Sequence, residues 1–118
     1  MIGTLSCIAL DCPDPTALAE FYRGVLGGEV DGAGDDWVDL VGPSTKLSFQ
    51  EVVGHRPPRW TGDEHGSQQL HLDVLVTDLD AAGEQVVALG ATVLDASHAP
   101  RWVVYADPAG HPFCLVTR

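Results

Sequence analysis

The chain contains an internal repeat, and this repeat restricts its possible folds more than any other feature. Residues 25–30 (VLGGEV) recur as residues 88–93 (ALGATV), and Trp37-Val38 recurs as Trp102-Val103. In each half, a strand-like run is followed by an amphipathic helix and then by several short strand-like runs. Two units of about 60 residues are too few for a solenoid. The repeat therefore predicts two tandem βαβββ modules in an α+β fold, with the helices outside and a concave pocket between two mixed sheets.

The helix of each half carries start and stop signals. In the first half, Asp14 and Pro15 predict an N-cap with proline at the first helical position, and Gly27 predicts the helix end. In the second half, Thr77 and Asp80 have the spacing of a capping box. The apolar stripe of the second helix is expected to contain Leu79, Ala82, Val86 and Leu89.

We expect a single domain over residues 1–118, which is long enough to bury a core. The first module spans about 1–53 and the second about 69–118. A connecting loop over about 54–68 contains Pro57-Pro58 and three glycines. Long irregular segments in compact domains are often functional, so this loop is a candidate for part of the pocket.

Charge and hydropathy exclude several classes of protein. The net charge is -11, and six Lys and Arg residues supply no basic patch for nucleic acid. No apolar run is long enough to span a membrane, and the N-terminus lacks the pattern of a signal peptide. Three cysteines, an odd number, favour reduced thiols. We therefore expect a cytoplasmic protein.

Three segments carry a resemblance to a known group of proteins: residues 21–27 (FYRGVLG), 69–73 (QLHLD) and 107–116 (DPAGHPFCLV). With the element order, they resemble the vicinal oxygen chelate superfamily, and in particular its glyoxalase-like, bleomycin-resistance-type branch common in actinobacteria. The resemblance covers nearly the whole chain. It implies the fold described above and a homodimer. The superfamily includes glyoxalase I, extradiol dioxygenases, fosfomycin-modifying enzymes and bleomycin-binding proteins, so one fold hosts several activities.

The resemblance also implies where a metal would bind. Metal-containing members place His, Glu, His and Glu on the first and last strands of each module. In this chain those positions fall on Cys7, His71 and Cys114, and near Phe49, with Gln50 or Glu51 as the alternative register. Only His71 is an ordinary match, so no cofactor is favoured. A divalent metal stays an alternative on Cys7, Glu51, His71 and Cys114, and two thiolates with an imidazole suit Zn²⁺.

Strand alternation indicates which side chains face the pocket. Leu72 and Val74 should meet the helix, which leaves His71 and Asp73 together on the opposite face. The same alternation directs Cys114 inward. The cysteines have a second interpretation as small buried hydrophobic residues, and the repeated tryptophans as core or dimer contacts.

Three functional hypotheses follow, and all have a small organic molecule as the partner. The first is a metal-free binding protein for an apolar or aromatic metabolite or antibiotic, because such pockets are mostly apolar with few polar groups. Its expected ligand-binding residues are Cys7, Phe49, Trp60, His71, Trp102 and Cys114. The second is a metal-dependent lyase, isomerase or dioxygenase. The third is a metal-free acid/base enzyme in which His71 is catalytic and Asp73 orients it.

Overall fold

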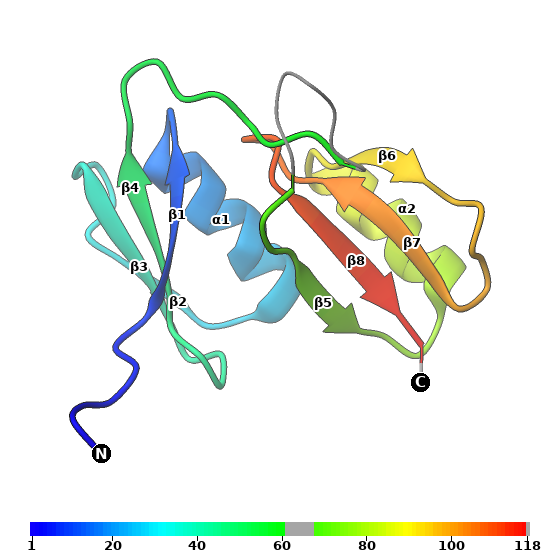
Figure 1. Ribbon diagram of the computed structural model, residues 1–118, viewed down its shortest axis with the longest axis horizontal. Helices are drawn as coiled ribbons and strands as arrows, with labels where there is room; N and C mark the ends of the chain where they lie inside the picture. Colours follow the sequence, from blue (N-terminus) through cyan, green and yellow to red (C-terminus); the bar gives the residue numbers. More distant parts are fainter. Residues whose placement is uncertain (61–67, 118) are drawn as a thin grey trace. The chain divides into compact units, whose positions relative to one another are not determined.

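The computed structural model describes residues 1–60 and 68–117. The chain divides into two compact units, Met1–His55 and Arg56–Arg118. Part of the connecting loop expected from the sequence, residues 61–67, lies outside the described residues. Within the described residues, each unit has one helix and four strands in the order βαβββ (Figure 1). The predicted duplication of an α+β module is confirmed.

The first unit is a four-stranded mixed sheet with one helix. Its elements are β1 (Ile8–Cys12), α1 (Pro15–Leu26), β2 (Glu29–Asp31), β3 (Trp37–Val41) and β4 (Leu47–Glu51). The sheet order is β1-β4-β3-β2. Strand β1 runs parallel to β4, and the other two pairs are antiparallel.

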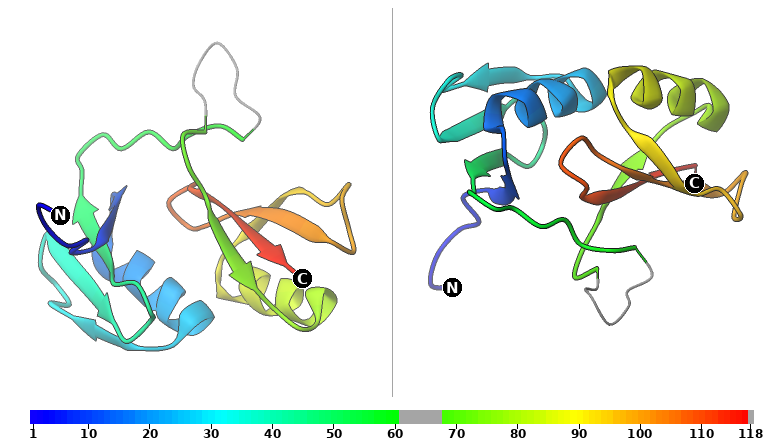
Figure 2. Two further views of the ribbon diagram at one scale, coloured as in Figure 1. Left: turned by 60° about the horizontal axis from the view of Figure 1, so that its bottom comes forward. Right: turned by 90° about the horizontal axis from the view of Figure 1, so that it is seen from above.

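The second unit repeats this topology. Its elements are β5 (Leu72–Leu75), α2 (Leu79–Leu89), β6 (Thr92–Asp95), β7 (Trp102–Ala106) and β8 (Pro112–Val116). The sheet order is β5-β8-β7-β6, with β5 parallel to β8. In both units the helix covers one face of its own sheet, as the views in Figures 1 and 2 show. The face of a sheet that is turned away from its own helix is called the far face below.

Local signals set the ends of α1 as predicted. The Asp14 carboxylate accepts a hydrogen bond from the Ala17 amide at 3.1 Å, Pro15 starts the helix, and Gly27 ends it with a φ of 76°. The helix then buries its apolar stripe, which includes Leu18, Ala19, Phe21 and Tyr22, against the sheet.

The start of α2 differs from the sequence prediction. Asp78 is the N-cap, and its carboxylate accepts from the Ala81 amide at 3.0 Å. The capping box predicted from Thr77 and Asp80 is therefore wrong by one residue. Asp is a better N-cap than Thr, because its carboxylate accepts strongly and complements the positive end of the helix dipole.

Helix α2 also buries less of its surface than predicted. Its buried residues are Gly83 and Val86, whereas Leu89, expected in the apolar stripe, is 45% exposed. At Gly83 the Tyr105 hydroxyl of β7 approaches the helix and leaves no room for a side chain. A groove of about 520 Å³ runs between α2 and the β6–β7 side of the sheet.

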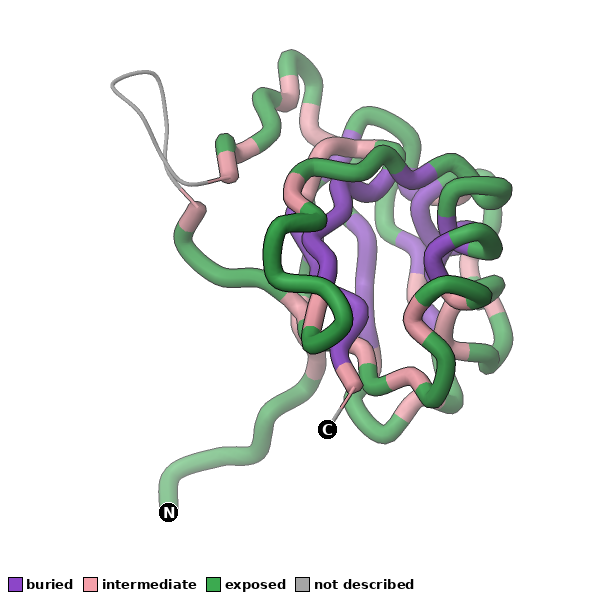
Figure 3. The backbone as a smooth tube through the Cα atoms, turned by 90° about the vertical axis from the view of Figure 1, so that its right-hand side faces the viewer, coloured by how far each residue is buried: buried purple, intermediate pink, exposed green. Residues whose placement is uncertain are grey.

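The buried residues gather on the strands and on the sheet-facing side of the helices, while the N-terminal segment is exposed (Figure 3). The two middle strands of the second sheet, β7 and β8, are buried along most of their length. Neither helix of the described residues has the length and apolar character needed to cross a membrane.

Candidate functional site

The strand registers show which positions of the two units correspond. In the first sheet, Ser48 is paired with Ala9 on β1 and Asp39 on β3. In the second sheet, Cys114 is paired with Asp73 on β5 and Val104 on β7. Because the repeat-equivalent Trp37 and Trp102 pair with Gln50 and Val116, the residues two positions earlier on those partner strands also correspond, and Ser48 is the counterpart of Cys114. Both point to the far face.

This register corrects the prediction for Phe49. Its side chain is fully buried, and its ring stacks on Tyr22 of α1 with centroids 5.9 Å apart and planes at 17°. Phe49 therefore faces the helix and belongs to the core of the first unit. The expectation that it lies on the ligand-facing side of the sheet is wrong, because side chains alternate along a strand and its neighbour Ser48 takes that side.

The second unit contains a cavity of about 500 Å³ over the far face of its sheet. Six of its lining residues carry the chemistry of interest: Trp60, His71, Asp73, Arg101, Trp102 and Cys114. Five of these six are predicted site residues, and the structure brings those five together. Arg101 is the residue that the sequence prediction missed. It comes immediately before Trp102, and its place beside a predicted pocket residue was the available signal.

The wall of this cavity is apolar and aromatic. Val104, Cys114 and Val116 form a buried cluster, and Trp60 and Trp102 pack against it. The imidazole of His98 stacks on Trp102 with centroids 4.5 Å apart. Trp102 therefore contacts both the buried cluster and the His98 ring.

The polar groups of the cavity lie in two places: His71 and Asp73 belong to the β5 edge of the sheet, whereas Arg101 and Thr117 lie where β7 begins and β8 ends. The His71 Nε2 atom is 3.2 Å from the Asp73 carboxylate, and both side chains are about one-third exposed. The Trp60 ring meets the His71 ring edge to face, with centroids 5.2 Å apart. The Arg101 guanidinium lies 5.2 Å from the centroid of the Trp102 ring. The Thr117 hydroxyl donates to the Pro100 carbonyl at 2.9 Å and is thereby held by the backbone.

Cys114 is a neutral thiol at physiological pH. Burial raises the pKa of this thiol to about 11, and the negative charge of Asp73 and a hydrogen bond to its carboxylate act in the same direction. A thiol with so high a pKa is a poor nucleophile. Cys114 therefore serves the cavity as a small apolar group that donates a weak hydrogen bond to Asp73.

Part of this cluster has the composition of a metal site. Donor atoms of His71, Asp73 and Cys114 all lie within 4.8 Å of one another, which makes it the one such group found among the described residues. Imidazole, carboxylate and thiolate are all ligands of Zn²⁺, so these three donors fit a divalent metal. The other two predicted ligands, Cys7 and Glu51, belong to the first unit. Cys7 is half-buried before β1, and Glu51 is exposed at the end of β4.

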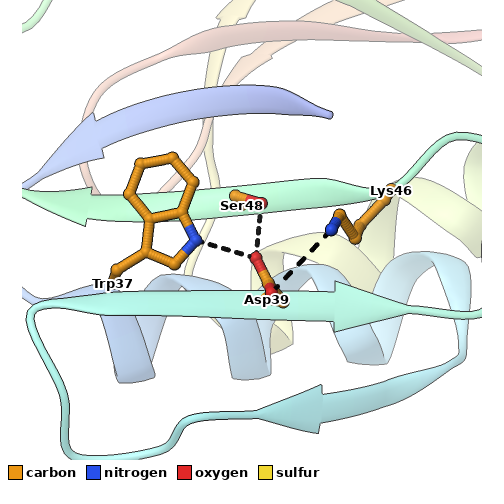
Figure 4. Close-up of polar contacts among 4 residues, drawn as sticks. All are labelled: Trp37, Asp39, Lys46 and Ser48. Atoms are coloured by element: carbon orange, nitrogen blue, oxygen red, sulfur yellow. Dashed lines mark hydrogen bonds and ion pairs between the residues drawn. The ribbon is translucent and has the colours of Figure 1, made fainter. Parts of the chain in front are cut away.

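The far face of the first sheet carries a polar cluster that the sequence prediction missed (Figure 4). Asp39 accepts hydrogen bonds from the Ser48 hydroxyl at 2.5 Å and from the Trp37 indole at 3.0 Å, and Lys46 lies 4.0 Å away. The hydrogen bond from Ser48 lowers the pKa of Asp39, and that from Trp37 and the charge of Lys46 add to the effect. The alternation of Asp39 with the apolar Val38 and Leu40 was the available signal.

Comparisons with known proteins support one fold family. A family model described as a glyoxalase-like domain matches residues 7–116. No curated protein matches the chain. Among solved structures, a glyoxalase/bleomycin resistance protein/dioxygenase family enzyme from Burkholderia phytofirmans PsJN is 18% identical, with a TM-score of 0.73 and 98% of each chain covered.

Two further solved structures have the same fold. A glyoxalase-related enzyme from Fulvimarina pelagi is 20% identical with a TM-score of 0.72, and the match covers 99% of this chain and 89% of that one. The fosfomycin resistance protein FosX from Listeria monocytogenes is 17% identical with a TM-score of 0.70, and the match covers 100% of this chain and 95% of that one. At these identities the likeness establishes the fold only, and the class of ligand has to be inferred from the site.

Proposed function

Because the chain belongs to the glyoxalase-like domain family of the vicinal oxygen chelate superfamily, we propose that it binds a small apolar or aromatic organic molecule in the cavity of its second unit. The observation that carries this proposal is the cavity of about 500 Å³ walled by Trp60, Trp102 and Val116. Pockets for organic ligands have volumes of about 300–1,000 Å³ and combine apolar walls with a few polar groups. His71 and Asp73 supply those polar groups.

The chemistry of Cys114 supports binding in preference to covalent catalysis. The position holds a buried neutral thiol in contact with a carboxylate, which is the opposite of an activated nucleophile. A metabolite or antibiotic that is bound and released unchanged needs only a shaped apolar wall and one or two orienting polar groups.

Binding is tested by isothermal titration calorimetry with planar aromatic probes, using a variant that fills the cavity. Val116→Phe adds a ring to the wall and should weaken binding at least tenfold, because the ligand and the new ring compete for the same volume. Val53→Phe, at a position that is 96% exposed in the first unit, is the matched control. Equal affinities in the wild type and in both variants would place the ligand elsewhere and overturn the proposal.

A metal-dependent lyase, isomerase or dioxygenase is the second candidate, and the cluster of His71, Asp73 and Cys114 favours it. These three side chains would hold the metal, which when bound would polarise a substrate oxygen or lower the pKa of a water. Protein purified without a His-tag or chelator should then contain nearly one metal per chain. If the protein contains far less metal than that, and if the wild type binds added Zn²⁺ no better than His71→Ala does, this candidate is excluded.

A metal-free acid/base enzyme is the third candidate, and the contact between His71 and Asp73 favours it. The carboxylate would orient the imidazole so that one ring nitrogen faces the substrate. His71→Gln should abolish turnover and leave the melting temperature nearly unchanged. A change in ligand affinity alone points back to a binding protein.

The proposal also includes the biological context expected from the sequence. We infer a single-domain protein of the cytoplasm, and a homodimer as the resemblance to the superfamily implies. Light scattering coupled to size-exclusion chromatography measures the oligomeric state. A mass of one chain at micromolar concentration contradicts the homodimer.

A further inference from the structure

The two charged groups of the second unit's cavity belong to separate parts of the sheet. Asp73 on β5 is paired with Cys114 on β8, whereas Trp102 on β7 is paired with Val116, two residues further along β8. From the ordinary spacing of strands and residues, the Cα atoms of Asp73 and Trp102 are about 12 Å apart. Arg101 precedes Trp102, so its charge and that of Asp73 can be considered separately.

The carboxylate of Asp73 is engaged within the protein. The His71 Nε2 atom lies 3.2 Å from it, and the Cys114 thiol donates a hydrogen bond to it. These contacts tie Asp73 to its neighbours on the sheet. We therefore assign no ligand group to this carboxylate.

The backbone of Arg101 is fixed, whereas its side chain has no ionic partner. The Arg101 amide donates to the His98 carbonyl at 3.0 Å, and the Arg101 carbonyl accepts from the Thr117 amide at 3.1 Å. The exposed guanidinium lies over the Trp102 ring, 5.2 Å from its centroid. Within residues 1–60 and 68–117, no carboxylate forms an ion pair with Arg101. Its positive charge is thus available to a ligand in the cavity that it lines.

The contact with Trp102 still leaves Arg101 able to bind an oxygen ligand. A cation–π contact gives the guanidinium no oxygen acceptor, and the group has five N–H donors in one plane. A carboxylate complements this donor set best, because its two oxygens match two parallel N–H bonds. Val116, in the apolar wall, is paired with the neighbour of Arg101. A ring on that wall therefore lies close to the guanidinium.

We propose that the cavity selects aromatic carboxylates, with the ring on the wall of Trp60 and Val116 and the carboxylate bound by Arg101. This inference rests on the proposed binding function and specifies its ligand. The net charge of -11 and the charge of Asp73 repel an anion at long range. At 0.15 M salt the Debye length is about 8 Å, so this repulsion is weakened, whereas a carboxylate in contact with Arg101 keeps its attraction.

The test uses three naphthalene derivatives of similar shape: 2-naphthoate, 2-naphthylmethanol and 2-naphthylmethylamine. Their dissociation constants are measured by calorimetry at about 0.15 M salt and about pH 8, where histidine side chains are mostly neutral. The wild type should bind the acid at least fivefold more tightly than the alcohol, and the amine no better than the alcohol. A fivefold preference corresponds to about 1 kcal/mol, the upper end of the range for exposed ion pairs.

Two variants locate the preference. Arg101→Gln keeps most of the length of the side chain and removes its charge, so acid and alcohol should bind about equally. Its melting temperature should match that of the wild type, because the side chain is exposed. Arg56→Gln is the matched control, since it makes the same change in net charge at an exposed position of the same unit outside the cavity lining. It should retain the preference for the acid.

The outcomes separate this inference from the function on which it rests. If none of the three probes binds, the binding function and the preference for carboxylates both fail. If the wild type binds the alcohol as tightly as the acid, the cavity binds aromatic molecules and the preference is overturned. The preference is also overturned if the amine binds most tightly, or if Arg101→Gln and Arg56→Gln weaken the binding of 2-naphthoate equally.

Discussion

Ser48 and Cys114 occupy the same position in the two units, and each is linked to a carboxylate on a different neighbouring strand. Ser48 donates to Asp39 on the antiparallel neighbour β3, whereas Cys114 contacts Asp73 on the parallel neighbour β5. The far faces of the two sheets differ accordingly. In the first unit the carboxylate is held by Ser48 and Trp37, while in the second it borders an apolar cavity.

Ser48→Ala should lower the free energy of unfolding by about 1–2 kcal/mol, because Asp39 loses a short hydrogen bond to a fully buried hydroxyl. Chemical denaturation measures the change. Ser44→Ala, at an exposed loop position, is the control and should change stability by less than about 0.5 kcal/mol. A loss no larger than that of the control contradicts the role given to this bond.

The stability that Asp39 contributes should disappear in acid. Its folded-state pKa is lowered, first of all by the hydrogen bond from Ser48. A carboxyl group whose pKa is depressed by folding stabilises the protein above its unfolded-state pKa, and this contribution is lost as the pH falls through the folded-state pKa. The difference in unfolding free energy between wild type and Asp39→Asn should therefore be constant near neutral pH and shrink below about pH 4. A difference that grows on acidification has the wrong sign.

Cys114 should resist alkylation in the folded protein. With a pKa of about 11, its thiolate fraction at pH 8 is on the order of 0.1%, and the side chain is also buried. Mass spectrometry after iodoacetamide treatment should show Cys7, which is half-buried, modified well before Cys114. Asp73→Asn removes a negative charge next to the thiol and should accelerate labelling of Cys114. Equal labelling rates of Cys7 and Cys114 in the wild type would contradict the described environment.

Gly83→Ala should destabilise the protein although alanine is the better helix former. A methyl group at this position would collide with the Tyr105 hydroxyl, which approaches the helix there. Tyr105→Phe removes that hydroxyl, so the double variant should recover stability relative to Gly83→Ala alone. In the Tyr105→Phe background the gain from replacing glycine in a helix is about 1 kcal/mol at most. Thermal unfolding of the wild type, the two single variants and the double variant gives the coupling free energy between the two residues. Additive effects would show that they do not interact.

The sequence predicted the modules because their signals are local. The cap at Asp14, the stop at Gly27 and the alternation of His71 with Leu72 each depend on a few neighbouring residues. The predicted side of the sheet for Phe49 was wrong because it was taken from the ligand positions that the resemblance implies and not from the alternation of side chains along the strand. Leu47 and Phe49 alternate with Ser48 and Gln50, and that pattern alone indicates Ser48 as the far-face residue.

The remaining errors and omissions concern contacts between distant segments. The exposure of Leu89 and the close approach of Tyr105 to Gly83 both depend on how the sheet lies against the helix, which helix periodicity does not contain. The edge-to-face contact of Trp60 with His71 joins two residues of the second unit that lie on either side of residues 61–67 in the sequence. Such contacts arise from tertiary packing, so local sequence patterns do not determine them.

The three tryptophans allow the central claim to be tested in one experiment. Trp60 and Trp102 line the cavity, whereas the Trp37 indole donates a hydrogen bond to the Asp39 carboxylate in the first unit. Their indole N–H signals can be assigned in ¹H–¹⁵N spectra by single Trp→Phe substitutions. Titration with a planar aromatic probe should shift the signals of Trp60 and Trp102 with one common dissociation constant and leave that of Trp37 in place. Absence of any saturable shift, or a shift of Trp37 as large as the others, would contradict ligand binding in the cavity of the second unit.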